Sequence, residues 1–281
     1  VQSLCSVHEE ADTRILLHAA DATQKGFQRL IIHCRDTDVL IMLIAFTQSL
    51  TEEVWMRAGT CKKPRFIKVH EISLSNDIIN GLLAFHAITG CDTTSQFTGI
   101  GKKSAWKVYQ RFPHLLHQLG EDLMPTPATI ASVEEFVCRL YNSSSVCQTI
   151  QEIRCIMFRK LKSNVDTLPP TYDALVLHIK RANYQALIWK QCLKTHPELP
   201  SPLNSGWHMV DGKLLPQLLT EKPVQANCVQ LSVCGCKEEG SQCGTRRCTC
   251  RKSNLYCTGA CGCARASWCM NSFMMEDEQN D

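Results

Sequence analysis

Hydrophobic residues recur at helix and strand spacings along the first third of the chain. Between Glu10 and Gly26 they recur at i, i+1, i+4 and i+5, which predicts an amphipathic helix. Residues 29–34 (RLIIHC) are mostly apolar, as in a buried strand, and an apolar, helix-like run extends from 39 to 47. Two more strands are predicted at 54–57 and 65–69. This alternation predicts an α/β fold with a mostly parallel sheet.

Helical spacing dominates the middle of the chain. An apolar helical run covers 82–88, and three longer helices are predicted at Val133–Tyr141, Cys147–Leu161 and Tyr172–Leu193. The last of these repeats apolar residues at helical spacing, so we expect Trp189 in the core. A proline-rich segment starts at His196, and the sequence GWHM at 206–209 predicts a local turn packed on the helices.

Composition narrows the class of protein. The 281 residues correspond to about two domains, and 44% hydrophobic with 20% charged residues is typical of a soluble globular protein. The net charge of +3 is too small to indicate nucleic acid by itself. We expect no membrane segment, because no apolar run reaches about 18 residues, and no secretory signal. Because the chain begins with Val1, we interpret it as a fragment.

Nine of the eighteen cysteines form a dense block of three C-x-C repeats, each followed by a third cysteine. The nine are Cys234, Cys236, Cys243, Cys248, Cys250, Cys257, Cys261, Cys263 and Cys269. Disulfides and metal are both explanations of such a block. A disulfide scaffold is typical of short secreted chains, whereas this block follows a long region with scattered cysteines. Intracellular metal binding is therefore favoured.

Zinc is the metal that this block predicts. Zn²⁺ takes four thiolates in a tetrahedron, so three ions need twelve ligand positions. Nine sulfurs supply them when three of the sulfurs bridge two ions each. The block contains no histidine, so the predicted cluster is all-sulfur.

The cysteine order, with the segments CTCRKSNLYC and CGC, resembles the CXC domain of tesmin-type proteins and chromatin regulators. The resemblance implies three zinc ions on nine cysteines, a DNA-binding surface and a nuclear location. The candidate DNA contacts are Arg246, Arg247, Arg251 and Lys252, with Tyr256 available for stacking. Residues 234–269 carry a formal +4, and the thiolates with their zinc ions contribute −3, which leaves about +1. DNA binding would therefore depend on where the arginines lie, and a structural or protein-binding zinc knob is the alternative.

Acidic residues follow the predicted elements of the first domain. Glu10 and Asp12 open the first helix, Asp36 and Asp38 follow the first strand, and Asp92 follows the apolar helical run. Carboxylates without basic neighbours suit Mg²⁺ or Mn²⁺, and two such ions activate water for phosphodiester hydrolysis.

A glycine-rich turn follows the acidic positions in sequence. Gly99 and Gly101 predict a tight hairpin at the start of a helix, where backbone N–H groups hold phosphate together with Lys102 and Lys103. The motifs EAD, DTD, GCDTT and GIGKKSA, over residues 7–112, resemble in order the carboxyl-terminal half of flap-endonuclease, PIN-like nucleases. The resemblance implies that the five acids hold metal and that the hairpin belongs to a helix-hairpin-helix that grips DNA.

The first acidic strands of that family have no counterpart in this chain. The resemblance therefore implies a truncated PIN-like sheet. It implies either an inactive half-site or, with an upstream segment, an active metal-dependent structure-specific nuclease. Each carboxylate also has a structural interpretation: Glu10 and Asp12 favour the positive end of a helix, and Asp36 suits an N-cap.

Other candidate groups have simpler explanations. His33 and His86 lie in apolar runs and are expected as core histidines, while Cys34 and Cys91 are expected to pack as small hydrophobic side chains. We predict a solvated helix face for Arg154, Arg159, Lys160 and Lys162. Contact of these residues with nucleic acid is the less favoured alternative.

These patterns together predict five regions. They are a PIN-like domain at 1–115, a helical extension at 116–195, a proline-rich linker at 196–230, a CXC zinc domain at 231–271 and an acidic tail at 272–281. We expect a DNA-associated protein derived from a mobile element. The alternatives are an active nuclease and a non-enzymatic zinc scaffold for protein partners that the sequence does not identify.

Overall fold

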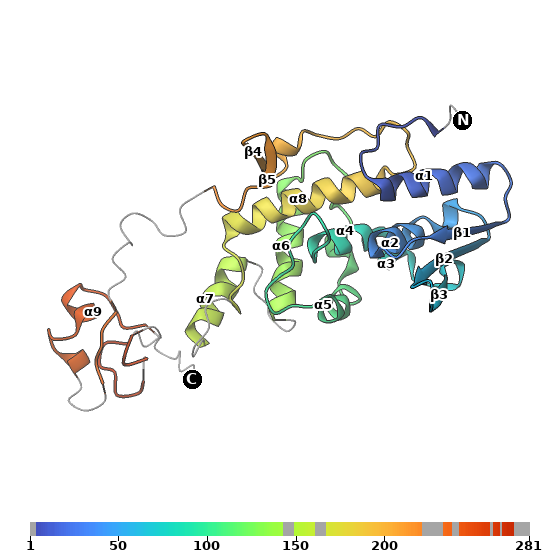
Figure 1. The fold of residues 1–281 in the computed structure, drawn as a ribbon. Coiled ribbons are helices and arrows are strands. Elements are labelled where there is room, and N and C mark those ends of the chain that lie inside the picture. Colours follow the sequence, from blue (N-terminus) through green and yellow to red (C-terminus); the bar gives the residue numbers. More distant parts are fainter. Residues whose placement is uncertain are drawn as a thin grey trace. The chain divides into compact units, whose positions relative to one another are not determined.

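A computed structural model describes residues 4–142, 149–160, 167–220, 233–237, 242–258, 261–264 and 266–272 (Figure 1). The chain groups into two compact units. The larger unit comprises Val1–Ile150 and Pro169–Thr220, and the cysteine unit comprises Gln151–Leu168 and Glu221–Asp281. The fold is mixed α/β with a cysteine-rich carboxyl-terminal region.

Nine α-helices and five strands lie within the described ranges. The helices are α1 (Ala11–Gln24), α2 (Thr37–Ala45), α3 (Asn76–Asn80), α4 (Leu82–Ile88), α5 (Lys102–Tyr109), α6 (Pro127–Tyr141), α7 (Ile150–Lys160), α8 (Tyr172–Lys190) and α9 (Thr249–Lys252). The strands are β1 (Arg29–His33), β2 (Glu53–Gly59), β3 (Pro64–Lys68), β4 (Trp207–Val210) and β5 (Lys213–Pro216). The predicted helices and strands of the first domain are thereby confirmed.

The main sheet has the order β1-β2-β3 and is mixed rather than mostly parallel. β1 pairs parallel with β2, because α2 forms the crossover between them. β2 pairs antiparallel with β3, because only a tight turn separates them, with mutual backbone hydrogen bonds between Thr60 and Lys63 of 3.1 and 3.2 Å. The fold prediction is correct in class, but one of its two strand pairs is antiparallel.

The core of the larger unit is built around α4 and α8. Every residue of α4 is buried, and this helix packs against α8 and α2. Figure 1 shows α8 as the long helix that runs past α6 and α4. Trp189 of α8 is 1% exposed, so the predicted core position of this side chain is confirmed.

The predicted start of α6 is wrong, and helix capping explains the difference. α6 begins at Pro127, six residues before the predicted Val133, because the Thr126 side chain accepts a hydrogen bond from the Thr129 N–H and Pro127 occupies the first turn. The end of α1 was predicted correctly: Gly26 has φ 85° and its N–H donates to the Thr23 carbonyl.

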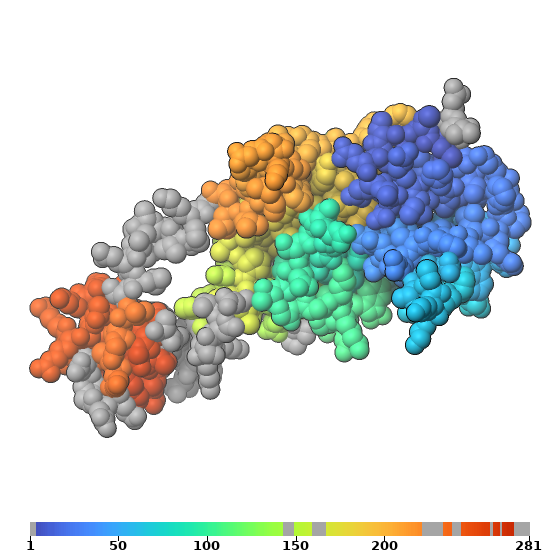
Figure 2. Space-filling model, viewed as in Figure 1, coloured from blue at the N-terminus to red at the C-terminus, as the bar shows by residue number. Residues whose placement is uncertain are grey.

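The predicted local turn at 206–209 is the start of a two-stranded hairpin, β4–β5. Arg181 of α8 fixes it, since its Nη1 donates to the carbonyl oxygens of Gly206 and Gln217 over 3.0 and 2.6 Å. The hairpin (orange) stands at the surface of the larger unit (Figure 2), and its Met209 and Leu215 are exposed. The segment 196–220 is therefore attached to α8 by specific contacts.

Some predicted features lie outside the described residues. They include residues 221–230 of the linker, residues 273–281 of the acidic tail, and the side chains of Arg159, Lys160 and Lys162. Within the part of the chain that the structure describes, no helix is both long and apolar enough to cross a membrane.

Candidate functional site

The nine cysteines of the three repeats form the core of the cysteine unit. Each is at most 5% exposed, although the surrounding chain is mostly turns with one short helix, α9. All nine are free thiols, and the Sγ–Sγ distances include 3.4 Å for Cys250–Cys261 and 3.7 Å for Cys248–Cys257. Two thiolates on one tetrahedral zinc lie about 3.8 Å apart, given Zn–S bonds of about 2.3 Å. The spacing of the sulfurs therefore suits a shared metal.

Close backbone packing joins the first and third repeats. The Gly262 N–H donates to the Cys234 carbonyl over 2.6 Å, and a Cβ at Gly262 would lie 3.0 Å from the backbone of Gly235. The Cys257 N–H donates to the Asn271 carbonyl over 2.7 Å and ties the second repeat to the end of the block. A side chain at position 262 would thus interfere with the close approach of the first and third repeats.

Four groups of four sulfurs each lie within 4.8 Å of one another. The groups are Cys234, Cys236, Cys243, Cys248; Cys243, Cys257, Cys263, Cys269; Cys234, Cys248, Cys250, Cys257; and Cys234, Cys257, Cys261, Cys263. Every one of the nine cysteines belongs to at least one group, and several belong to more than one. These buried four-cysteine groups are compatible with zinc, which takes four sulfur ligands.

Burial controls the protonation of these thiols. It raises the pKa of Cys236 to about 11 and the pKa of Cys250 to about 12, and it raises the pKa of Cys243 and Cys257 as well. At Cys261 burial is outweighed by hydrogen bonds from the backbone of Cys234 and Thr258, and the pKa is about 7. Zinc binds the thiolate, so loading the cluster releases protons.

The predicted DNA-contacting residues lie on the outside of the cysteine unit. Arg246 and Arg247 precede α9, whereas Arg251 and Lys252 form its last turn, and all four are exposed. Tyr256 is 60% exposed. Among the described residues no ion pair involves any of the four cations. The four charges lie within seven consecutive residues and face solvent beside the sulfur core.

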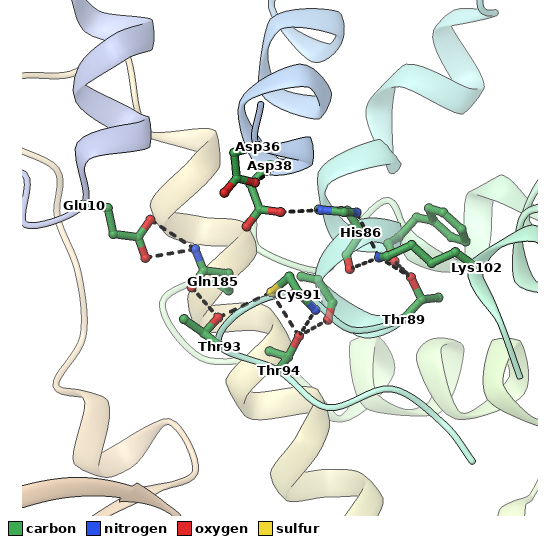
Figure 3. A network of polar contacts seen from close by, with 12 residues as sticks. Glu10, Asp36, Asp38, His86, Thr89, Cys91, Thr93, Thr94, Lys102 and Gln185 are labelled. Atoms are coloured by element: carbon green, nitrogen blue, oxygen red, sulfur yellow. Dashed lines mark hydrogen bonds and ion pairs between the residues drawn. The ribbon is translucent and has the colours of Figure 1, made fainter. Parts of the chain in front are cut away.

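Four of the five predicted acidic residues occupy the amino-terminal ends of two helices in the larger unit, and Figure 3 shows Glu10, Asp36 and Asp38 among them. Glu10 is the residue before α1 and Asp12 lies in the first turn of that helix. Asp36 is the N-cap of α2, because its Oδ1 accepts the Asp38 N–H over 2.9 Å. Asp92 lies in a tight turn after α4. The N-cap interpretation of Asp36 is thereby confirmed, while the Glu10 side chain caps no backbone group.

Two of the five carboxylates, Glu10 and Asp12, have pKa values that are shifted by their surroundings. The pKa of Glu10 is raised, mainly by burial and further by the charges of Asp12, Asp38 and Asp92, although a hydrogen bond from Gln185 opposes the shift. The pKa of Asp12 is also raised, by burial and by Asp36, Asp38 and Asp92. Residues from 10 to 92 in sequence therefore form one acidic cluster.

The acidic cluster is looser than the cysteine cluster. Within the described ranges, groups of three or more potential ligand atoms that lie within 4.8 Å of one another consist of cysteine alone. A cation held by the carboxylates would therefore need the helix ends to approach more closely, or ligands in addition to these five. Their role as Mg²⁺ or Mn²⁺ ligands remains a prediction.

His86 connects the acidic cluster to the glycine-rich turn. This α4 side chain is 3% exposed; its Nε2 lies 2.7 Å from Asp38 Oδ1, and its Nδ1 lies 2.9 Å from Lys102 Nζ. The lysine ammonium donates to Nδ1, so Nε2 carries the ring proton and donates to Asp38. His86 is thus a satisfied core histidine, as predicted, and also a direct partner of a predicted metal ligand, which the sequence did not indicate.

Lys102 is turned inward. Its Nζ also contacts the His86 carbonyl over 3.0 Å and Thr89 Oγ1 over 3.1 Å, and burial of this ammonium lowers its pKa to about 8. Lys103, beside it, is exposed. Both lysines are exposed as whole residues, but the ammonium group of Lys102 is already held by these contacts.

The glycines of the hairpin are open to solvent. Gly99 has φ 75°, which favours glycine, whereas Gly101 has no such requirement, and neither has an atom within 4 Å of an added Cβ. Packing therefore does not explain Gly101, and the backbone at this position is accessible to a ligand.

Gln185 of α8 forms a second polar link at the acidic cluster (Figure 3). Its Nε2 donates to the two Glu10 oxygens over 3.3 and 3.4 Å, and its Oε1 accepts from Thr93 Oγ1 over 2.7 Å. The Cys91 Sγ contacts the hydroxyls of Thr93 and Thr94, so it has polar partners instead of packing as an apolar group. Gln185 lies 175 residues from Glu10, and no local motif in the sequence indicates this contact.

The prediction of a core position for His33 is wrong. This residue ends β1, an edge strand, and its ring is exposed with Nδ1 3.4 Å from Arg57 Nη1. Cys34 is half-buried, and its Sγ accepts from the Asp36 N–H over 3.4 Å. An apolar run at a sheet edge buries only alternate side chains, which explains the difference.

Comparison with protein-family models, curated proteins and solved structures finds no match to this chain.

Proposed function

We propose that the chain is a DNA-associated protein in which a three-zinc cluster on nine cysteines presents basic residues to nucleic acid. The observation that carries the proposal is the arrangement of the cysteine unit. Nine buried thiols lie in overlapping groups of four, and four unpaired cations lie immediately outside them in the described sequence. The resemblance of the repeat to CXC domains supports the same function.

The sulfur groups support three zinc ions. Two groups share only Cys243 and together contain seven of the nine sulfurs. The two remaining sulfurs, Cys250 and Cys261, lie 3.4 Å apart, so a third ion between them completes the set. The third ion would complete its four ligands with one bridging sulfur from each of the other two groups. Nine thiolates then satisfy three tetrahedral ions, which is the count that the sequence predicts.

The positions of the cations support contact with DNA rather than general attraction. The loaded cluster would be nearly neutral, so phosphate binding depends on the local group of Arg246, Arg247, Arg251 and Lys252. Guanidinium groups form bidentate contacts with phosphate, and an exposed tyrosine such as Tyr256 stacks on bases. These residues together define a compact, sequence-independent phosphate contact.

The test is equilibrium binding of the zinc-loaded full chain to duplex DNA across a range of salt concentrations. Reversing the charges of Arg247 and Arg251 should weaken binding most at low salt and reduce the log–log salt slope by roughly 2, since each phosphate contact contributes about 0.9. The matched control reverses Lys62 and Lys63, an exposed pair in the β2–β3 turn, and should leave the slope nearly unchanged. If the arginine variant binds like the unchanged chain, the cluster is a structural or protein-binding knob.

The acidic cluster supports a second candidate activity, metal-dependent cleavage of DNA. Burial and the neighbouring carboxylates raise the pKa of Glu10 and Asp12, an environment that a bound cation would relieve, and the open glycine turn follows these residues in the chain. The looseness of the cluster favours an incomplete, nuclease-like domain that needs a further segment or partner.

A further inference from the structure

A cavity of 440 Å³ lies in the larger unit, beside the acidic cluster. Its walls come from α8, from the segment before α1, and from the segment that leads into β4. Glu10, Thr93 and Gln185 line one side, and Figure 3 shows these three joined by hydrogen bonds. The volume falls within the range of small-molecule sites in proteins, about 300–1,000 Å³.

The buried polar atoms that lack a partner are concentrated at this cavity. Across the described residues there are three: Ser6 Oγ, His8 Nδ1 and Trp207 Nε1. His8 and Trp207 line the cavity, and Ser6 is next to Val7, which also lines it. Unpaired buried polar atoms are costly and uncommon, so their concentration here points to a missing partner. These three atoms are not exposed to solvent. A ligand in the cavity would therefore reach them only after a small shift of the side chains in the cavity wall.

Two aromatic rings face the cavity without contacting each other. Tyr184 comes from α8 and Trp207 from β4, and both line the cavity. The ring–ring contacts of the larger unit do not include this pair, although several other aromatic pairs of that unit pack together. Both rings are therefore available to a planar ligand from the cavity side.

We propose that this cavity holds the base of a nucleotide, stacked against Tyr184 and Trp207, with its sugar and phosphate outside the cavity. Nucleobases combine a flat apolar face with donors and acceptors along one edge, which matches aromatic walls next to unpaired nitrogens at His8 and Trp207. Glu9 and Glu10 line the cavity, and their carboxylates repel a phosphate, so the sugar and phosphate of the ligand extend away from them. The choice of a nucleotide as ligand rests on the proposed nucleic-acid function.

The experiment is a titration of the zinc-loaded full chain with dAMP, followed by ligand-observed NMR, with deoxyribose 5-phosphate as the probe that lacks a base. We expect dAMP to bind and deoxyribose 5-phosphate not to compete. Tyr184→Ala and Trp207→Ala should each weaken dAMP binding about tenfold. Trp207→Phe, which keeps a ring, should weaken it less, and Trp55→Ala in β2 is the control that should leave it unchanged. Should an alanine variant not fold, quenching of 2-aminopurine deoxyriboside monophosphate by the unchanged chain reports stacking directly.

Three results would overturn the inference: no dAMP binding, equal binding of the sugar phosphate, or equal binding by the folded variants at Tyr184 and Trp207. The result of the dAMP titration can be distinguished from the result of the DNA-binding test. Arginine-dependent DNA binding without dAMP binding rejects the cavity and keeps the zinc-cluster function. Binding of dAMP that is sensitive to Tyr184, without arginine-dependent DNA binding, keeps the cavity and rejects the zinc-cluster function.

Discussion

His86 Nε2 donates to Asp38 Oδ1 over 2.7 Å, although 48 positions separate the two residues in sequence. The opposite ring nitrogen accepts from Lys102, so the imidazole is fixed between an acid and a base in a buried position. This arrangement orients the Asp38 carboxylate, and it links α2, α4 and the start of α5. One side chain of α4 therefore holds the starts of two other helices, α2 and α5.

Replacing His86 with alanine should lower the free energy of unfolding by about 1–3 kcal/mol, because Asp38 and Lys102 both lose a buried partner. Denaturant unfolding of the zinc-loaded chain measures the change. His114→Ala, at an exposed histidine of the same unit, is the control and should have little effect. A His86 variant as stable as its control would show that the contact contributes nothing to the fold.

Lys102 should make stability depend on alkaline pH. Its pKa of about 8 in the folded chain lies below the ordinary lysine value of 10.5, because burial disfavours the charged form. Between those values the unfolded chain binds more protons at this residue, so the contribution of Lys102 to stability rises with pH. The free energy of unfolding of the unchanged chain minus that of Lys102→Met should increase from pH 8 to 10. A difference that stays constant or falls with pH contradicts the inward position of this amine.

Asp12→Asn should stabilise the chain in the absence of divalent cations. The pKa of Asp12 is raised by burial and by its acidic neighbours, so its charge opposes folding at pH 7, and removing it should raise the melting temperature by about 1–3 °C. Added Mn²⁺ should stabilise the unchanged chain more than the variant, if the cluster binds the ion. Asp211→Asn, in the exposed β4–β5 turn, serves as control. A variant that is less stable without metal would mean that Asp12 is a structural residue.

Cys243→Ser should disrupt zinc loading beyond a single ion, because Cys243 is the one sulfur common to the two groups that together contain seven of the nine cysteines. Native mass spectrometry should find three zinc ions on the unchanged chain and at most one on the variant. Cys61→Ser, at an exposed cysteine outside the block, should still carry three. Disulfides in place of metal in the freshly prepared chain, or a variant that loses one ion only, would refute the shared-sulfur arrangement.

We expect the chain alone not to cleave flap or duplex DNA with Mg²⁺ or Mn²⁺, since the acidic cluster does not bring three ligand oxygens within 4.8 Å in the described residues. Gel assays on labelled DNA test this. Cleavage that disappears in Asp36→Asn would establish the active nuclease instead. If an added upstream segment supplies activity, Asp38→Asn and Asp92→Asn should abolish it by removing metal ligands.

Local features of this chain were predictable because local physics determines them. Apolar periodicity located α2, α4, α8 and the three main strands, and Gly26 marked the end of α1. The spacing of the cysteines predicted that their sulfurs would gather, because each C-x-C pair places two sulfurs close together, and both cysteines of each pair share a four-sulfur group. The start of α6 was missed because apolar periodicity begins after its Thr126 cap.

Contacts between distant parts of the chain were not predictable in the same way. The antiparallel pairing of β3 depends on a turn that carries no strong sequence signal. The bonds of His86 to Asp38 and of Gln185 to Glu10 join residues 48 and 175 positions apart, and they arise only once α4 and α8 pack. The cavity beside Glu10 has the same origin, since its walls come from three separate segments.

The contact between Gly262 and the backbone at Gly235 has a consequence for the order of folding during synthesis. The Cys234 carbonyl finds its donor in the Gly262 N–H, and each of the first cysteines shares a sulfur group with residues made later. The first repeat can therefore complete a four-cysteine group once Cys248 of the second repeat has emerged, but its backbone contact waits for Gly262 of the third repeat. A chain that stops before residue 262 therefore lacks the donor to the Cys234 carbonyl and the sulfurs of Cys263 and Cys269, and two of the four sulfur groups stay incomplete.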